Sequence, residues 1–257
     1  MELNILPKFV DEAATPIAQS VGNSISGVWN LVFGNHVSLW LKKQEFRHQR
    51  NYEDFVNRTN AKVENIPQEN LQEPEMYILG PAIEASKYYI DSEELREMFA
   101  NLIASSVDSR ANNITHPAFV EIIKQLSSLD ASILKNFTFR KEFPIAQIRF
   151  TNDEGFYLII YEHLMAFSNT NNEFEMRIAS ISNLQRLGLI NIDYNVYLDN
   201  PTYYDFVEQH PAFIKANQSL QLEEYTRDGF KNYKVQKGSV NLTPLGQNFI
   251  LACCITT

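Results

Sequence analysis

The segment from residue 80 to residue 134 constrains the fold more than any other, because it carries start and stop signals for several helices in close succession. Asp91, with Glu94 three residues later, has the pattern of a capping box and predicts a helix start. Pro117 suits the first turn of the next helix, where its missing N–H costs nothing, and Ser128 is a favourable N-cap. The apolar spacing predicts one helical core, formed by Leu95, Phe99, Leu102, Phe119, Ile122, Ile123 and Leu126.

Upstream of this core, residues 75–90 have helical spacing with a proline inside it. Proline in a helix interior loses a backbone hydrogen bond and clashes with the preceding turn. We therefore expect this helix to break near Gly80 and Pro81.

Near the N-terminus, residues 13–41 contain no Asp, Glu, Lys or Arg. Five apolar residues follow the three-and-four spacing of one helix face: Ile17, Val21, Ile25, Val28 and Trp29. The remaining positions are too polar for an ordinary transmembrane helix. Two interpretations stay open: a helix packed within the protein, or a segment that meets a membrane surface or a partner, with the cations Lys42, Lys43 and Arg47 next to anionic headgroups.

The composition of the chain changes after residue 138. Residues 145–150 and 155–161 are rich in aromatic and branched side chains, which fits a strand or a buried helix equally well. Residues 189–196 alternate like a strand, and 233–242 can pair back with them across a long polar excursion. We expect a helix within that excursion, near residues 210–225, and a last helix that opens at Thr243 and Pro244.

Sequence motifs for catalysis or cofactor binding are missing. The chain contains no GxxxxGKS/T, GxGxxG, HExxH, GxSxG or EF-hand pattern, so we expect no enzyme activity and no cofactor. The carboxylates of Glu93, Glu94 and Glu97 suit a helix N-terminus by interaction with the helix dipole. Two other polar pairs, Asp108 with His116 and Glu162 with His163, lack a third partner for catalysis or for a metal.

Composition places the chain among soluble globular proteins, with 44% hydrophobic and 21% charged residues. The net charge of −9 argues against general nucleic-acid binding, although a local patch can override the total. The two cysteines, Cys253 and Cys254, are adjacent and fit neither a disulfide nor a zinc site, and no signal peptide is visible at the N-terminus. We expect a cytoplasmic protein, with association to a membrane when it is active.

Three blocks in the helical region also resemble a known family. GPAIEASKYY, EELREMFANLIA and HPAFVEIIKQLS occur in order and at matching spacing with the bacterial abortive-infection alpha family. The resemblance covers roughly residues 15–137. It implies a cellular role in defence against bacteriophage and implies no particular reaction.

The second half of the chain resembles a winged-helix domain. The blocks LDASILKNF, ISNLQRLGLINID and VNLTPLGQNFILACC follow the order of that fold, with an unusually long hairpin insertion. Winged helices serve in DNA binding and in protein contact alike, so the fold does not choose between them. The candidate nucleic-acid or partner contacts are the cations of the helix and the returning hairpin arm: Arg177, Arg186, Arg227, Lys231, Lys234 and Lys237.

Together these patterns predict a mainly α protein, α+β overall. Its helical region spans residues 1–115 and its winged-helix-like region spans 116–257. We consider two functions: a non-enzymatic antiphage sensor or effector that contacts a protein, itself or a membrane surface, and a winged-helix regulator that binds nucleic acid. Acidic residues interrupt the cationic set, so DNA is the less expected partner.

Overall fold

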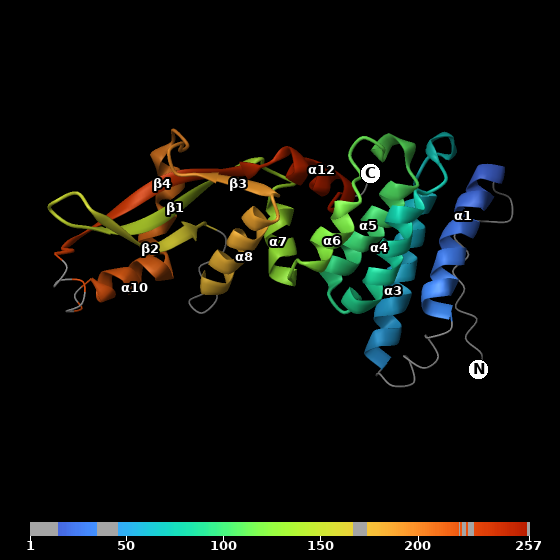
Figure 1. Cartoon of the computed structure of the whole chain (residues 1–257), viewed down its shortest axis with the longest axis horizontal. Helices are drawn as coiled ribbons and strands as arrows, with labels where there is room; N and C mark the ends of the chain where they lie inside the picture. The colour runs from blue at the N-terminus through green and yellow to red at the C-terminus, as the bar shows by residue number, and fades with distance from the viewer. Residues whose placement is uncertain are drawn as a thin grey trace. The chain divides into compact units, whose positions relative to one another are not determined.

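The computed structural model describes residues 15–34, 46–166, 174–220, 222, 225 and 229–255 (Figure 1). The chain forms two compact units. Unit 1 consists of Met1–Ser132 with Asn248–Thr257, and unit 2 consists of Ile133–Gln247. The sequence predicted two consecutive regions that meet at residue 115, whereas the compact units separate after residue 132 and the C-terminal residues return to unit 1.

Unit 1 begins with the charge-free segment, which forms helix α1 (Pro16–Trp29) and a π-helical turn η1 (Asn30–Gly34). Val21, Ile25, Val28 and Trp29 are buried and Ile17 is half-buried, so the predicted helix and its packed face are confirmed. The Trp29 indole stacks on Phe55 with 5.1 Å between ring centroids. Its Nε1–H donates to the Tyr52 hydroxyl at 2.6 Å. A buried indole is normally satisfied in this way.

Two local predictions for unit 1 were wrong. Helix α4 (Met76–Tyr89) runs through Pro81 without ending. Pro81 is exposed in the second turn of the helix, where water can hydrate the carbonyl group that loses its donor. Helix α5 (Glu93–Ser106) is capped by Ser92, whose Oγ accepts from the Leu95 N–H at 3.3 Å. The helix therefore begins one residue later than the capping-box pattern indicated.

Most side chains of α5 are buried, and this helix forms the centre of unit 1. All seven predicted core residues are buried as expected. The C-terminal helix packs in the same unit, because Asn101 and Ser105 of α5 donate to the Cys253 and Ala252 carbonyl oxygens, each at 2.9 Å. The other helices of this part of the chain are α3 (Phe46–Glu64), η2 (Gln68–Asn70), η3 (Ser109–Ala111), α6 (Ala118–Lys124), α7 (Ser128–Asn136) and α12 (Pro244–Cys253).

Unit 2 is built on an antiparallel sheet with strand order β2-β1-β4-β3. Its strands are β1 (Glu142–Thr151), β2 (Tyr157–Leu164), β3 (Ile190–Asp193) and β4 (Asn232–Leu242). Ala146, Ile148 and Phe150 point to one face, where they form a core with α10 residues such as Phe213. Figure 1 shows helices α8 (Phe174–Arg186) and α10 (Pro211–Ser219) on the same side of the sheet. The two ambiguous segments are therefore strands, each with one face against a core.

The predicted pairing of residues 189–196 with 233–242 is confirmed for Ile190–Asp193, which pair with Leu242–Ser239. The long connection contains η4 (Pro201–Tyr204), α9 (Phe206–Gln209) and the expected helix α10. At the junction to α12, Gly246 lies so close to the backbone that an added Cβ would sit 1.9 Å from the Leu189 carbonyl oxygen. The structure thus has a mainly helical chain with one antiparallel sheet, and the winged-helix assignment stays a prediction.

Candidate functional site

A small cavity in unit 2 is lined by two histidines, an arginine and apolar side chains. It lies beside the end of β2, α8 and the start of α10, and is lined by Ile133, His163, Met165, Phe174, Arg177, Ile178, Ile181 and His210. Its volume is about 10 Å³. This is about the space that one water molecule needs. In this form the cavity is too small for an organic substrate.

His163 occupies an unusual backbone position at the cavity. Its φ angle of 59° lies in the left-handed region, which is uncommon for a residue other than glycine. The β1–β2 register shifts between Ala146 and Ile148, so β2 bulges here. The His163 N–H donates to the Tyr194 hydroxyl at 2.9 Å, and the two rings stack with 6.3 Å between centroids. Burial lowers the pKa of His163 and raises the pKa of Tyr194 to about 12.

His210 acts as the N-cap of α10. Its Nδ1 accepts from the Ala212 N–H at 3.2 Å, which requires that Nδ1 carry no proton. The ring is buried and meets Phe174 edge to face at 5.7 Å. Burial lowers the pKa of this imidazole below its usual value, so the neutral form that caps the helix is favoured.

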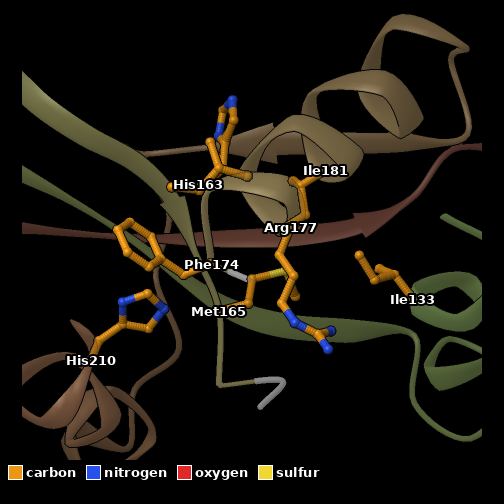
Figure 2. A pocket seen from close by; sticks show the side chains of 8 residues that line it. Ile133, His163, Met165, Phe174, Arg177, Ile181 and His210 are labelled. Carbon is orange, nitrogen blue, oxygen red and sulfur yellow. The ribbon is translucent and has the colours of Figure 1, made fainter. Parts of the chain in front are cut away.

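The polar side chains at the cavity do not converge on a common point (Figure 2). The His163 imidazole and the Arg177 guanidinium point in opposite directions, and the guanidinium points away from both histidine rings. The arrangement has room for about one water molecule between these side chains.

The structure separates the predicted cationic contacts. Arg177 lines the cavity, whereas Arg186 lies at the end of α8 and donates to the Asn183 Oδ1 at 2.8 Å. On the strand β4, side chains alternate between faces, so Lys234 lies on the face opposite to Lys237 and to Lys231, just before the strand. Arg227, Lys42 and Lys43 lie outside the described residues, as does the side chain of Arg47.

A network of charges in unit 1 joins α3 to α5. Arg58 donates to Asp54, Glu97 and Glu93 at 2.7, 2.7 and 3.1 Å. Lys62 donates to Glu97 at 2.6 Å, and the buried Arg96 donates to Asp54 at 2.8 Å. Two of the three glutamates that the sequence assigned to the helix dipole, Glu93 and Glu97, are thus also ion-pair partners. Sequence reasoning missed the pairs between the two helices because those partners are 35 to 42 residues apart.

Of the other two polar pairs that the sequence singled out, Asp108 and His116 have separate partners, whereas Glu162 and His163 lie next to each other. Asp108 is fully buried and its carboxylate accepts from the Arg110 guanidinium at 2.6 Å. His116 is exposed, and its Nδ1 accepts from the Ala118 N–H at 3.1 Å. Glu162 lies 3.7 Å from the Nε2 of His163. Across the ranges that the structure describes, no group of three His, Cys, Asp or Glu residues could hold a metal ion.

The open part of the unit 2 sheet is the second candidate site. Strand β2 is an edge of the sheet. Four consecutive apolar side chains at its start are exposed: Phe156 by 65%, Tyr157 by 55%, Leu158 by 41% and Ile159 by 42%. Edge strands of soluble proteins usually carry charges or proline that prevent pairing with another chain. An uncharged exposed run at an edge therefore marks a surface for contact.

The fold and these sites define a mainly helical protein with one antiparallel sheet and an exposed strand edge. The chain matches the abortive infection alpha family over residues 47–253, and it belongs to that family. The match includes the sheet of unit 2 as well as the helices in which the sequence resemblance was noted. Membership suggests a role in abortive infection, a form of defence. No curated protein and no solved structure matches the chain.

None of the described helices is both long and apolar enough to cross a membrane. The apolar face of α1 is covered within unit 1. These findings leave membrane-surface contact as a prediction.

Proposed function

We propose that this protein acts in antiphage defence as a non-enzymatic sensor or effector, and that it works by pairing with a second copy of itself along the β2 edge. Its family supports the defence role. The observation that carries the contact is the exposed apolar run from Phe156 to Ile159 at that edge. An edge strand offers unpaired backbone N–H and C=O groups, which an added strand can satisfy.

A binding role is supported over catalysis by the geometry of the cavity. The cavity has room for about one water molecule, and its polar side chains point in different directions. The apolar edge, by contrast, offers a continuous surface. Apolar area removed from water contributes roughly 25 cal/mol per Å², so four such side chains on each copy can support association.

The partner that we propose for the β2 edge is the same edge of a second copy of the protein. The run from Phe156 to Ile159 has no charged residue, and its nearest acids, Glu154 and Glu162, lie outside it on either side. Two such runs can pair antiparallel about a two-fold axis with apolar side chains opposite one another. Isologous contacts of this kind are the commonest in homo-oligomers, and cross-strand apolar pairs stabilise them.

The experiment compares the native protein with Leu158→Lys, which places a charge in the centre of the run. We expect light scattering to show a dimer for the native chain and a monomer for the variant, and we expect phage protection in cells to fall with the dimer. Leu251→Lys is the matched control, because Leu251 is the same residue with nearly the same exposure, 42%, on α12. A native monomer, or equal protection by both variants, would contradict the proposal.

The winged-helix regulator remains the second candidate. The order α7, β1, α8, β3, β4 and α12 is compatible with that fold. However, Arg177 lines the cavity and the β4 lysines lie on two faces, so these cations do not form one patch for a duplex. Submicromolar, salt-sensitive binding of duplex DNA would support this candidate over self-association. Cytoplasmic localisation and membrane contact by the Ile17 to Trp29 face are also proposals, and cell fractionation during infection would test both.

A further inference from the structure

The sheet of unit 2 has an open face that is distinct from its edge. On this face three rows of residues follow one another across β2, β1 and β4. Tyr157, Thr151 and Asn232 pair in the outermost row, and Ile159, Arg149 and Lys234 pair in the next. The innermost row, Gln147 and Gln236, is bounded by the Tyr194 backbone, whose carbonyl oxygen accepts from Gln236 at 2.8 Å. The core face with α10 lies on the other side.

Two cations stand directly opposite each other on the open face. Arg149 and Lys234 are register partners in β1 and β4. Like charges at such positions destabilise a sheet. In the ranges that the structure describes, no carboxylate lies within ion-pair distance of either cation. Two acids of the same strands and turn contact other residues: Glu162 lies 3.7 Å from His163, and Asp153 in the β1–β2 turn lies 3.6 Å from Lys231. The face therefore carries a local excess of positive charge.

An aromatic side chain lies next to this charge. The Arg149 guanidinium sits 4.3 Å from the centroid of the Tyr157 ring, and its Nε donates to Gln147 at 2.7 Å. Tyr157 is 55% exposed. The guanidinium thus lies over one face of the exposed ring and is held there by the hydrogen bond to Gln147, next to the cation Lys234.

We propose that this open face binds single-stranded nucleic acid, with Arg149 and Lys234 on phosphates and Tyr157 stacked against a base. Proteins that bind single strands combine a cationic track with exposed aromatic rings in this manner. The exposed Asn232 and the half-buried Thr151 in the outermost row can donate to base edges or phosphates. The inference goes beyond self-association, because it concerns the face of the sheet, while Tyr157 and Ile159 also belong to the exposed run at the β2 edge.

The charge and shape of the face favour single-stranded nucleic acid over a duplex and over a membrane surface. The face of a sheet several strands wide cannot enter the major groove of a duplex, whereas unstacked bases can lie on it. A membrane surface fits poorly, because the turn next to the face carries Asp153 and Glu154, and the face itself offers only two apolar side chains, Tyr157 and Ile159.

The test measures fluorescence anisotropy of labelled RNA and DNA single strands of about 15 nucleotides, and of the matching duplex, with the full chain. We expect both single strands to bind more tightly than the duplex at about 50 mM salt and to weaken as salt rises to about 200 mM. Lys234→Gln should weaken binding roughly five-fold and lower the salt slope by about 0.7, the effect of one phosphate contact on a single strand. Lys231→Gln removes the same charge from the opposite face and should leave affinity within about two-fold.

The stacking contact is tested with its own variant and control. Tyr157→Ser should weaken binding roughly ten-fold and Tyr157→Phe should keep it, whereas Tyr233→Ser, on the core face, should have little effect. Thermal unfolding of each variant confirms that it is folded. Duplex binding as tight as single-strand binding, an equal loss with Lys231→Gln, or no single-strand binding at low salt would overturn the inference. Binding to anionic vesicles in place of either strand would assign the face to a membrane and also overturn it.

Discussion

The arginines of the two units have different charged neighbours. In unit 1, Arg58 contacts three carboxylates, from Asp54, Glu93 and Glu97. In unit 2, Arg149 faces the cation Lys234 across the sheet. Charges that are paired between helices hold one helix to another, while charges left opposite like charges cost stability unless a partner neutralises them. We infer that the paired charges of unit 1 stabilise the fold, whereas the opposed cations of unit 2 are available to bind a ligand.

Within the unit 1 network, the pKa values of the partners shift as paired charges should. Burial acts to raise the pKa of Glu97, but the hydrogen bonds from Lys62 and Arg58 outweigh it and lower the pKa overall. The hydrogen bond to Glu97 also raises the pKa of Arg58. Both shifts favour the charged forms.

The largest effect should come from the apolar core that supports this network. Phe99 is fully buried in α5, so Phe99→Ala should lower the free energy of unfolding by about 3–5 kcal/mol through lost burial and the cavity left behind. Urea denaturation measures the change. Phe139→Ala, at a side chain 91% exposed, is the control and should change it by less than about 0.5 kcal/mol. A loss below about 1 kcal/mol for Phe99→Ala would mean that the core does not dominate unit 1.

A smaller loss should follow from breaking the network itself. Glu97→Gln removes the carboxylate that Arg58 and Lys62 share, and should cost about 2 kcal/mol at neutral pH. Because the folded-state pKa of Glu97 is lowered, its contribution is present above the usual value of 4.5 and is lost as pH falls through the folded pKa. The native protein and the variant should therefore converge in stability under acid, as urea titrations at several pH values would show. Glu121→Gln, in an exposed pair with Lys124, should have a much weaker effect.

A smaller expected effect is the pH dependence of stability that comes from the buried His210. His210 and His116 both precede a proline and both accept a backbone N–H through Nδ1, but only His210 is buried. The lowered pKa of His210 means that its contribution to stability is full above the usual pKa of 6.5 and falls as pH drops below it. The slope is at most about 1.4 kcal/mol per pH unit.

His210→Asn keeps an N-cap acceptor and removes the titration. We expect thermal unfolding of this variant to depend less on pH between about 7 and 5 than the native protein does. His163, whose pKa burial also lowers, should supply the remaining dependence. An identical profile for His210→Asn and the native chain would contradict this account.

The smallest expected effect is a gain in stability, and it tests the comparison between the two units most directly. Removing one of two opposed cations should stabilise unit 2, so Lys234→Gln should raise the free energy of unfolding by a few tenths of a kcal/mol at low salt. The gain should disappear near 1 M salt, where the Debye length is about 3 Å. Arg58→Gln should destabilise under the same conditions. A loss of stability with Lys234→Gln would show that Lys234 has a structural partner.

Several elements could be predicted because one periodic face is enough to define them. The buried face of α1 was readable from the spacing of Val21, Ile25 and Trp29. A helix was expected near residues 210–225, and the structure has α10 at Pro211–Ser219. In contrast, residues 145–150 are rich in aromatic and branched side chains, and the sequence alone left a strand and a buried helix equally open. Only the pairing of that run with β2 and β4 decided its structure.

By itself, the sequence determined the family resemblance and the mainly helical character of the first half, because each depends on residues close together along the chain. The pairing of β3 with β4 was also predicted, from the alternation of two segments that a long connection separates. Tertiary structure alone decided where charges meet. Arg58 finds Glu97, and Arg149 faces Lys234, across separations that local patterns do not encode. A shift of one residue in strand register would move every side chain to the other face. The candidate sites therefore depend on register and helix packing, which long-range burial sets.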